Sequence, residues 1–323
     1  MHFFKRRKYN YLAYLFLCFP LLNAKTVKIE EILLSGDITN PDNEISGMDW
    51  YQGLLFMIPE NLNKFIYAIP KIELDNYFLS TNPIPIIPRK IRLKTPNYNN
   101  LINGFDGFEA IAFYKDNVFL SIEAKSNNHM KGFIAWGTSD PLTQEIFIPL
   151  DNLIEIETPI QIDNMSYESI IANGNDLILL YEANGVNLQK SPEHKVFSII
   201  EFSTSKIISS NIEYRITDAT KIDSNGKFWC INYLWPGDKI KLKPHKEFYL
   251  NEIEKNNNYK QIERLIEFEL KNGKILLTEN EPINFELEND ISRNWEGIVR
   301  YGKDSFLIVT DKYPRMILGM VKK

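Results

Sequence analysis

The chain has very few of the residues that carry disulfide or zinc chemistry. Its 323 residues include only two cysteines and four histidines. Cys18 lies in an apolar N-terminal segment, so Cys230 is left without a partner for an internal disulfide, and we expect it to be a small buried apolar residue. The histidines lie far apart, without the spacing of zinc ligands: His2, His129, His194 and His245.

Short catalytic motifs and an excess of positive charge are also missing. The sequence contains no Gly-x-Ser-x-Gly elbow, no phosphate-binding glycine loop and no dinucleotide fingerprint. It has 42 acidic residues against 37 lysines and arginines, and a formal net charge of −5. Because contact with a phosphate backbone requires clustered Lys and Arg, this balance argues against nucleic acid as a partner.

The first 24 residues predict an export signal. A basic cluster, Lys5–Lys8, precedes an apolar run, Tyr11–Leu22, which is short for a membrane span. Cleavage after Ala24 would leave a single domain, residues 25–323, with a formal charge of −9 and no stable membrane span. We therefore expect an exported protein, periplasmic or extracellular. The alternatives are an uncleaved anchor or a buried segment.

A strand–turn–strand pattern occurs five times along the rest of the chain. In each copy a polar residue opens an apolar strand, a polar turn follows, and a second apolar strand ends in a polar residue. The opening residues are separated by 63, 59, 52 and 76 residues, a spacing typical of four-stranded propeller blades: Ser46, Glu109, Glu168, Thr220 and Glu296.

This repeat predicts an all-β fold, a five-bladed β-propeller. The fifth copy has only three expected strands, whereas Thr26–Ser35 is an expected strand that belongs to no copy. Pairing the N-terminal strand with the last blade would close the ring and protect the sheet edges from aggregation. A six-bladed propeller, with a blade in the 76-residue interval, is the alternative, and two packed β domains come third.

The opening residues are the predicted metal site. The first strand of a propeller blade lines the central channel, so these residues would converge at one channel mouth. Three of them are carboxylates, which repel each other unless they are protonated or neutralised by a cation. Hard oxygen ligands suit Ca²⁺, so we expect it to bind Ser46, Glu109, Glu168, Thr220 and Glu296. The alternative is that these residues only cap strand ends.

The second strands return to the same face and end in an outer polar ring: Glu60, Glu123, Glu182, Asn232 and Asp311. Its four acidic members are candidate general bases. The segment Asp238–Tyr259 interrupts the fourth copy on this face, either as a solvated loop or as a lid over an anionic substrate. The candidate substrate-binding cations are Lys239, Lys241, Lys243, Lys312 and Arg315. Three aromatic residues near this face are candidates for stacking or for packing: Tyr233, Trp235 and Tyr313.

The pattern resembles two families of propeller proteins. Glu44-Ile45-Ser46-Gly47 and the hairpins that start at Phe108 and Asn294 resemble the phytase-like esterase domain of bacterial secreted propellers. The order Ser, Glu, Glu, Thr, Glu resembles the soluble calcium-activated nucleotidases, or apyrases. The resemblance implies five blades, a central Ca²⁺ held at these strand starts, and hydrolysis of phosphate esters or anhydrides.

The chain departs from the apyrase pattern in the first blade. Where that family has an Asp-Asp-Arg type segment that works on the phosphates, this chain has Pro59-Glu60-Asn61. Two hypotheses follow. The first is an exported, Ca²⁺-dependent hydrolase that acts on a small anionic molecule. The second is a non-catalytic propeller that binds a ligand or a protein and has a structural Ca²⁺.

Overall fold

The computed structural model describes residues 26–61, 64–245, 259–287 and 291–323. The predicted export signal, residues 1–24, lies outside the described residues, as does part of the predicted lid, residues 246–258. Throughout the described ranges, no helix has the length and apolar character needed to cross a membrane.

Strand pairing groups most of the chain into five successive antiparallel units. The first contains β3 (Ile45–Tyr51), β4 (Leu54–Pro59), β5 (Phe65–Pro70) and β6 (Arg89–Lys94). The second contains β7 (Phe105–Tyr114), β8 (Asn117–Ser126) and β9 (His129–Ser139), paired in that order. Two short strands, β10 (Ile146–Phe147) and β11 (Leu153–Ile156), both pair with β9. The third contains β12 (Tyr167–Asn173), β13 (Asp176–Tyr181), β14 (Glu193–Ser198) and β15 (Ser203–Ser209).

The last two units have the same hairpin order. The fourth contains β16 (Arg215–Ala219), β17 (Lys227–Leu234), β18 (Ile262–Lys271) and β19 (Lys274–Leu277), and β18 also pairs with β20 (Ile283–Phe285). The fifth contains β21 (Trp295–Arg300), β22 (Ser305–Thr310) and β23 (Leu318–Lys322). Short helices lie between strands: η1 (Asp37–Thr39), η2 (Pro41–Asn43), α1 (Lys71–Leu79), α2 (Tyr98–Leu101) and α3 (Lys239–Leu242).

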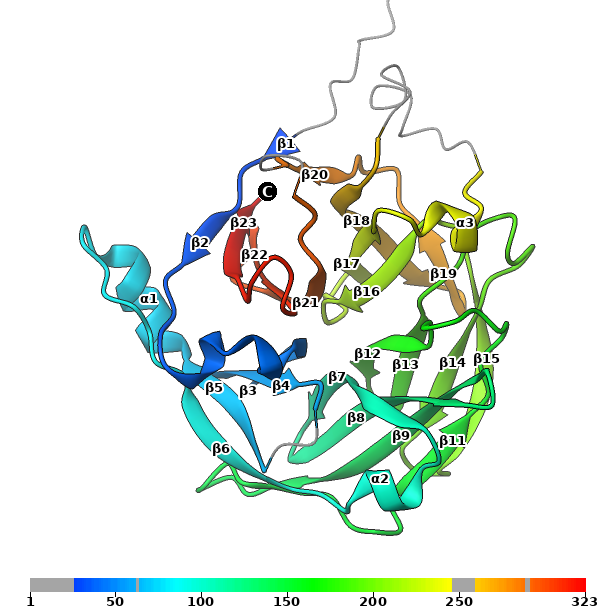
Figure 1. Ribbon diagram of the computed structural model, residues 1–323, viewed down its shortest axis with the longest axis horizontal. Helices are drawn as coiled ribbons and strands as arrows, with labels where there is room; N and C mark the ends of the chain where they lie inside the picture. The colour runs from blue at the N-terminus through cyan, green and yellow to red at the C-terminus, as the bar shows by residue number, and fades with distance from the viewer. Residues whose placement is uncertain (1–25, 62–63, 246–258, 288–290) are drawn as a thin grey trace, which may run out of the picture.

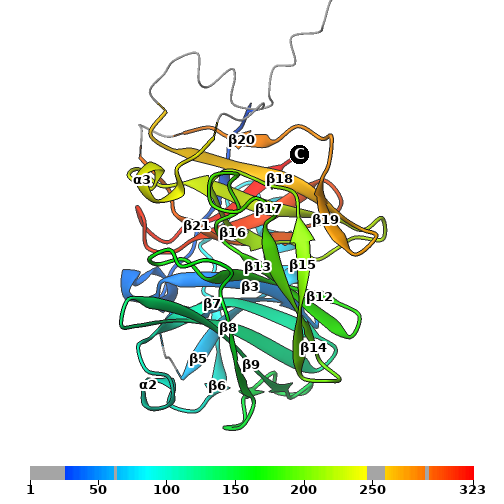
Figure 2. The ribbon, with the colours of Figure 1, turned by 90° about the vertical axis from the view of Figure 1, so that its right-hand side faces the viewer.

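The units surround a central channel. Each first strand contacts the first strand of the next unit, and β21 contacts β3, so these strands form a closed ring. Figure 1 shows the units arranged around this centre. Figure 2 gives the side view, in which α3 lies on one face of the ring. The all-β class and the propeller arrangement are therefore confirmed.

The N-terminal strand closes the ring as predicted. β2 (Glu30–Ile32) pairs antiparallel with β23, on the side opposite β22. The preceding strand, β1 (Thr26–Val27), pairs parallel with β20. Parallel bridges β6–β10 and β15–β19 join neighbouring units into larger sheets, so the count of five blades stays a prediction, and we refer to the groups as units.

Apolar side chains fill the spaces between neighbouring units. Each of five buried clusters combines residues from adjacent units, such as Phe56 with Phe113, and Leu307 with Met48. Cys230 is buried in the cluster between the third and fourth units, as expected from the sequence. The apolar alternation along each strand thus produces stacked faces that hold the units together.

The ring closure yields a stability prediction. Leu318 is fully buried in β23, where its backbone is paired with Ile32 on one side and Val309 on the other. Leu318→Ala should lower the free energy of unfolding by about 2–5 kcal/mol, because it leaves a cavity in the closing unit. Urea unfolding measures this. Leu142→Ala, at a position that is 88% exposed, is the control. Equally small effects of the two substitutions would contradict the idea that packing of the closing unit stabilises the fold.

Candidate functional site

A polar cavity of about 180 Å³ opens at one mouth of the channel. Eight acidic and two basic residues line it, together with one serine and two asparagines. The lining residues are Glu44, Ser46, Glu60, Asp106, Glu109, Glu123, Asn164, Glu168, Arg215, Asn294, Glu296, Asp311 and Lys312. If all of them were ionised, the cavity would carry an excess of six negative charges, a strong field for a cation.

β-Bulges direct four of the five predicted metal residues into this cavity. The pairing of first and second strands shifts register around Ser46, Glu109, Glu168 and Glu296. A bulge leaves one residue unpaired and turns its side chain away from the regular alternation. Because the same irregularity recurs at the same place in four units, all four side chains line the same cavity.

The fifth predicted metal residue, Thr220, is not brought to the cavity. Its hydroxyl accepts a hydrogen bond from Trp229 N (3.0 Å) and donates to Lys221 O (3.2 Å). The register shift of the fourth unit instead spans Thr217, whose hydroxyl donates to Trp295 O at 2.5 Å. The sequence analysis placed the start of this strand too late, because β16 begins at Arg215.

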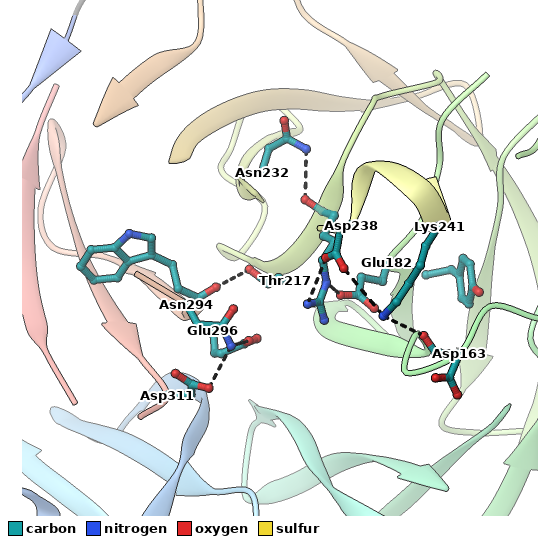
Figure 3. A network of polar contacts seen from close by, with 12 residues as sticks. Asp163, Glu182, Thr217, Asn232, Asp238, Lys241, Asn294, Glu296 and Asp311 are labelled. Carbon is teal, nitrogen blue, oxygen red and sulfur yellow. Dashed lines mark hydrogen bonds and ion pairs between the residues drawn. The ribbon is translucent and has the colours of Figure 1, made fainter. Parts of the chain in front are cut away.

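The acidic ends of the second strands lie at or beside the cavity. Glu60, Glu123 and Asp311 line it, and fully buried Glu182 accepts a hydrogen bond from Arg215. A Cβ atom on Gly107 would come within 2.3 Å of Glu60 Cγ, so the missing side chain leaves room for Glu60. Figure 3 shows Glu182, Glu296 and Asp311 around the mouth.

Arg215 is a site residue that the sequence analysis missed. Its side chain is 12% exposed, is paired with Glu182, and lies 3.8 Å from Asp238 Oδ2 through Nη1. Asn232 fixes its backbone, because the amide donates to Arg215 O (3.0 Å) and accepts from Arg264 Nε (2.8 Å). The signal in the sequence is slight, a single basic residue at the start of the short strand β16.

Six of the eight carboxyl groups that line the cavity hold protons unusually strongly. Burial, aided by a hydrogen bond with Glu44, raises the pKa of Glu60 to about 9. Burial raises the pKa of Glu168 to about 7, although Arg215 opposes the shift. Burial and neighbouring carboxylates also raise the pKa of Glu109, Glu123 and Glu296 well above the ordinary value. Several of these groups therefore remain neutral at pH 7 when no cation is present.

Arg215 responds in the opposite sense. Burial alone would lower the pKa of its guanidinium, but Glu296, Glu168 and Asp238 outweigh this effect and raise it. Arg215 is thus a permanent positive charge inside an acidic cavity.

The predicted substrate-binding cations separate into different environments. Lys312 lines the cavity and donates to Glu44 Oε1 at 2.5 Å. Lys241 is not among the lining residues, and its Nζ lies 3.7 Å from Asp238 Oδ1. Lys239 instead donates to Tyr259 O at 2.5 Å. Lys243 is exposed, and Arg315 does not line the cavity but is paired with Glu31.

The cavity has the oxygen ligands that a Ca²⁺ site needs, but these ligands are not grouped into a coordination shell. In the part of the chain that the structure describes, no three Asp, Glu, His or Cys side chains are grouped closely enough to hold a metal ion as they stand. Within that part, Glu123 Oε2, Glu168 Oε2 and Glu182 Oε2 are buried and have no hydrogen-bond partner. Unpartnered carboxylate oxygens beside the Ser46 hydroxyl are the hard ligands that Ca²⁺ takes, so the residues fit this ion in type.

Comparisons with known proteins give structural neighbours but no family. No family model and no curated protein matches the chain. A thermostable family-43 glycoside hydrolase aligns over 90% of this chain and 92% of its own, with 10% identity and a TM-score of 0.49. An α-L-arabinanase mutant from Cellvibrio cellulosa aligns over 93% of this chain and 92% of its own, with 12% identity and a TM-score of 0.47. The soluble aldose sugar dehydrogenase of Escherichia coli aligns over 92% of this chain and 100% of its own, with 8% identity and a TM-score of 0.44. Likeness at this level does not transfer an activity, and the resemblance to phytase-like domains and apyrases stays a prediction.

The raised pKa of Glu60 predicts how stability depends on pH. Between the ordinary value of 4.5 and about 9, the folded state keeps a proton that the unfolded state releases. The free energy of unfolding should therefore fall as pH rises through this window, by up to about 1.4 kcal/mol per pH unit for this group. Glu60→Gln should reduce the slope, as measured by urea unfolding in chelator. Exposed Glu279→Gln is the control, and parallel curves for wild type and Glu60→Gln would contradict the assignment.

Proposed function

We propose that this chain is an exported, Ca²⁺-assisted hydrolase of phosphate esters or anhydrides, which acts on small anionic molecules at the channel mouth. The observation that carries the proposal is the placement of Arg215 in the same cavity as a group of buried carboxyls with unpartnered oxygens. A cation site and an anion-binding side chain are thereby combined in one cavity.

Arg215 and Lys312 support binding of the phosphate. They are the two basic residues that line the cavity. Arginine offers a planar set of donors that matches phosphate oxygens, and lysine offers a point charge. Arg215 thus takes the place of the arginine that Pro59-Glu60-Asn61 lacks, but from the fourth unit instead of the first.

Glu109, Glu168 and Glu296, with the Ser46 hydroxyl, would hold the Ca²⁺. These residues line the cavity and are carried by bulges in four different first strands. Bound there, the ion supplies charge neutralisation and Lewis-acid stabilisation of phosphoryl oxygens. Burial and, after it, repulsion from neighbouring carboxylates raise the pKa values of Glu109 and Glu296, and the ion would relieve this repulsion.

The second-strand carboxyls would move the protons. Glu60 keeps its proton at neutral pH and can donate it to the leaving oxygen as a general acid. Asp311 is held by Asn294 Nδ2 (2.9 Å) and Tyr313 N (2.7 Å), and it can accept a proton from the attacking water. Glu123 also faces the cavity and is a second candidate for the base.

A non-catalytic ligand-binding propeller with a structural Ca²⁺ is the second candidate. It is favoured by the internal pairing of the cavity cations. Glu182 and Asp238 already neutralise Arg215, and Glu44 already neutralises Lys312. The same side chains could therefore stabilise the mouth without contacting a substrate.

Turnover and thermal stability, measured together, separate the two candidates. The purified protein should hydrolyse nucleotides or phosphomonoesters in Ca²⁺ and lose this activity in chelator. Glu296→Gln and Arg215→Met should each lower kcat/KM by about 10²–10³-fold, the usual loss when one charge-stabilising contact is removed. Glu279→Gln is the matched surface control.

Other outcomes would decide against the hydrolase. A Tm that rises with Ca²⁺ without turnover of any phosphate compound would favour the binding propeller. A Tm that does not respond to Ca²⁺ or chelator would contradict the cation site in both candidates.

A further inference from the structure

Three aromatic side chains form a row beside the cavity, which we call the aromatic row: Tyr233, Trp235 and Tyr313. The ring centroids of Tyr233 and Trp235 are 6.2 Å apart, and those of Trp235 and Tyr313 are 5.5 Å apart. Tyr233 lies near the end of β17, whereas Tyr313 comes from the connection between β22 and β23. The row therefore joins the fourth and fifth units at the mouth of the channel.

The two ends of the aromatic row lie next to the two cavity cations. At one end, Tyr233 is the direct cross-strand partner of Arg215 in the pairing of β16 with β17. At the other end, Lys312 Nζ lies 5.9 Å from the centroid of the Tyr313 ring. Tyr313 N also donates to Asp311 Oδ1 at 2.7 Å, which fixes the backbone of Tyr313 beside this lining residue.

Packing alone does not account for the row. Tyr313 is 49% exposed and Trp235 is half-buried, so ring surface remains accessible at the rim. The Tyr233 hydroxyl, in contrast, is buried and has no hydrogen-bond partner among the residues that the structure describes. Tyr167 and Tyr181, which are buried to a similar degree, donate to the Glu157 and Ile160 carbonyls. An unpartnered buried hydroxyl is costly, and a ligand oxygen would remove this cost.

We propose that the aromatic row binds a flat aromatic ring in the leaving group of the substrate, so that the site prefers aryl phosphates to aliphatic ones. This inference rests on the proposed phosphate site. With the phosphate near Arg215 and Lys312, the ester oxygen faces the rim and its ring reaches Trp235. The Trp235 and Tyr313 planes are tilted by 59°, which allows a ring to stack on one and meet the edge of the other.

Binding of phosphonates, which cannot be hydrolysed at the P–C bond by this chemistry, tests the inference without turnover. Calorimetry with Ca²⁺ present compares 1-naphthylphosphonate with propylphosphonate. The wild type should bind the naphthyl compound at least about tenfold more tightly, in line with stacking on aromatic side chains. Trp235→Ala and Tyr313→Ala should each remove most of this preference and leave the affinity for propylphosphonate unchanged.

Two further variants complete the design. Tyr233→Phe should weaken both compounds several-fold, because only the hydroxyl is lost. Phe202→Ala, at a half-exposed aromatic position on the outer edge of the third unit, should change neither affinity. The Tm of each variant is measured to confirm that it folds. If Trp235→Ala does not fold, the ring preference is tested with Tyr313→Ala alone.

Failure of the inference differs from failure of the proposed function. Equal affinity of the wild type for the two phosphonates overturns the aromatic-ring inference and leaves the phosphate site standing. If neither compound binds, the phosphate site itself is overturned. Tighter binding of a glucosyl C1-phosphonate than of 1-naphthylphosphonate, lost in Trp235→Ala, overturns the aryl assignment in favour of a sugar ring.

Discussion

The rest of the structure depends on the burial of many carboxyl groups around one guanidinium. Burial opposes the charge of Arg215, but Glu296, Glu168 and Asp238 raise its pKa. Glu182 is paired with it, and Asp238 Oδ2 lies 3.8 Å from its Nη1. These residues come from the third, fourth and fifth units and from the segment after β17, and the packing of three successive units brings them together. One permanent positive charge cannot compensate the excess of acidic groups, and the remaining ones must keep protons or bind a cation. This imbalance is the physical reason to regard the mouth as a functional site.

The channel wall holds these groups in place. Two buried aspartates link neighbouring first strands through backbone amides: Asp49 accepts from Phe113 N and Asp218 from Ile298 N, both at 2.7 Å. Gly47 allows the first two units to approach, because a Cβ atom there would lie 3.0 Å from Ala110 Cα. Bulges then turn one side chain per strand towards the axis. Rigid backbone contacts below the mouth thus position the polar groups at it, which is what a preorganised site requires.

Sequence reasoning was successful where a local pattern repeats. Alternation and spacing predicted the all-β class, the propeller arrangement and the closing strand. Eight of the thirteen residues that line the cavity were candidate site residues in the sequence, and their roles stay predictions. Thr220 does not line the cavity, because β16 begins earlier than predicted and has a wide register shift, which short apolar runs do not reveal. Arg215 was missed for the same reason. Lys239 and Arg315 have partners that are distant in the sequence, the Tyr259 carbonyl and the Glu31 carboxylate, and charge counting along the chain cannot predict them.

The central claim is that the buried carboxyls form a cation site beside a fixed arginine. A crystal structure of the protein grown with Ca²⁺ tests it most directly. We expect one ion on the channel axis, with oxygens of Glu109, Glu168 and Glu296 at about 2.3–2.6 Å and Arg215 still paired with Glu182. A structure at saturating Ca²⁺ with no ion in the cavity, and with the carboxyls hydrogen-bonded only to each other, would contradict the account.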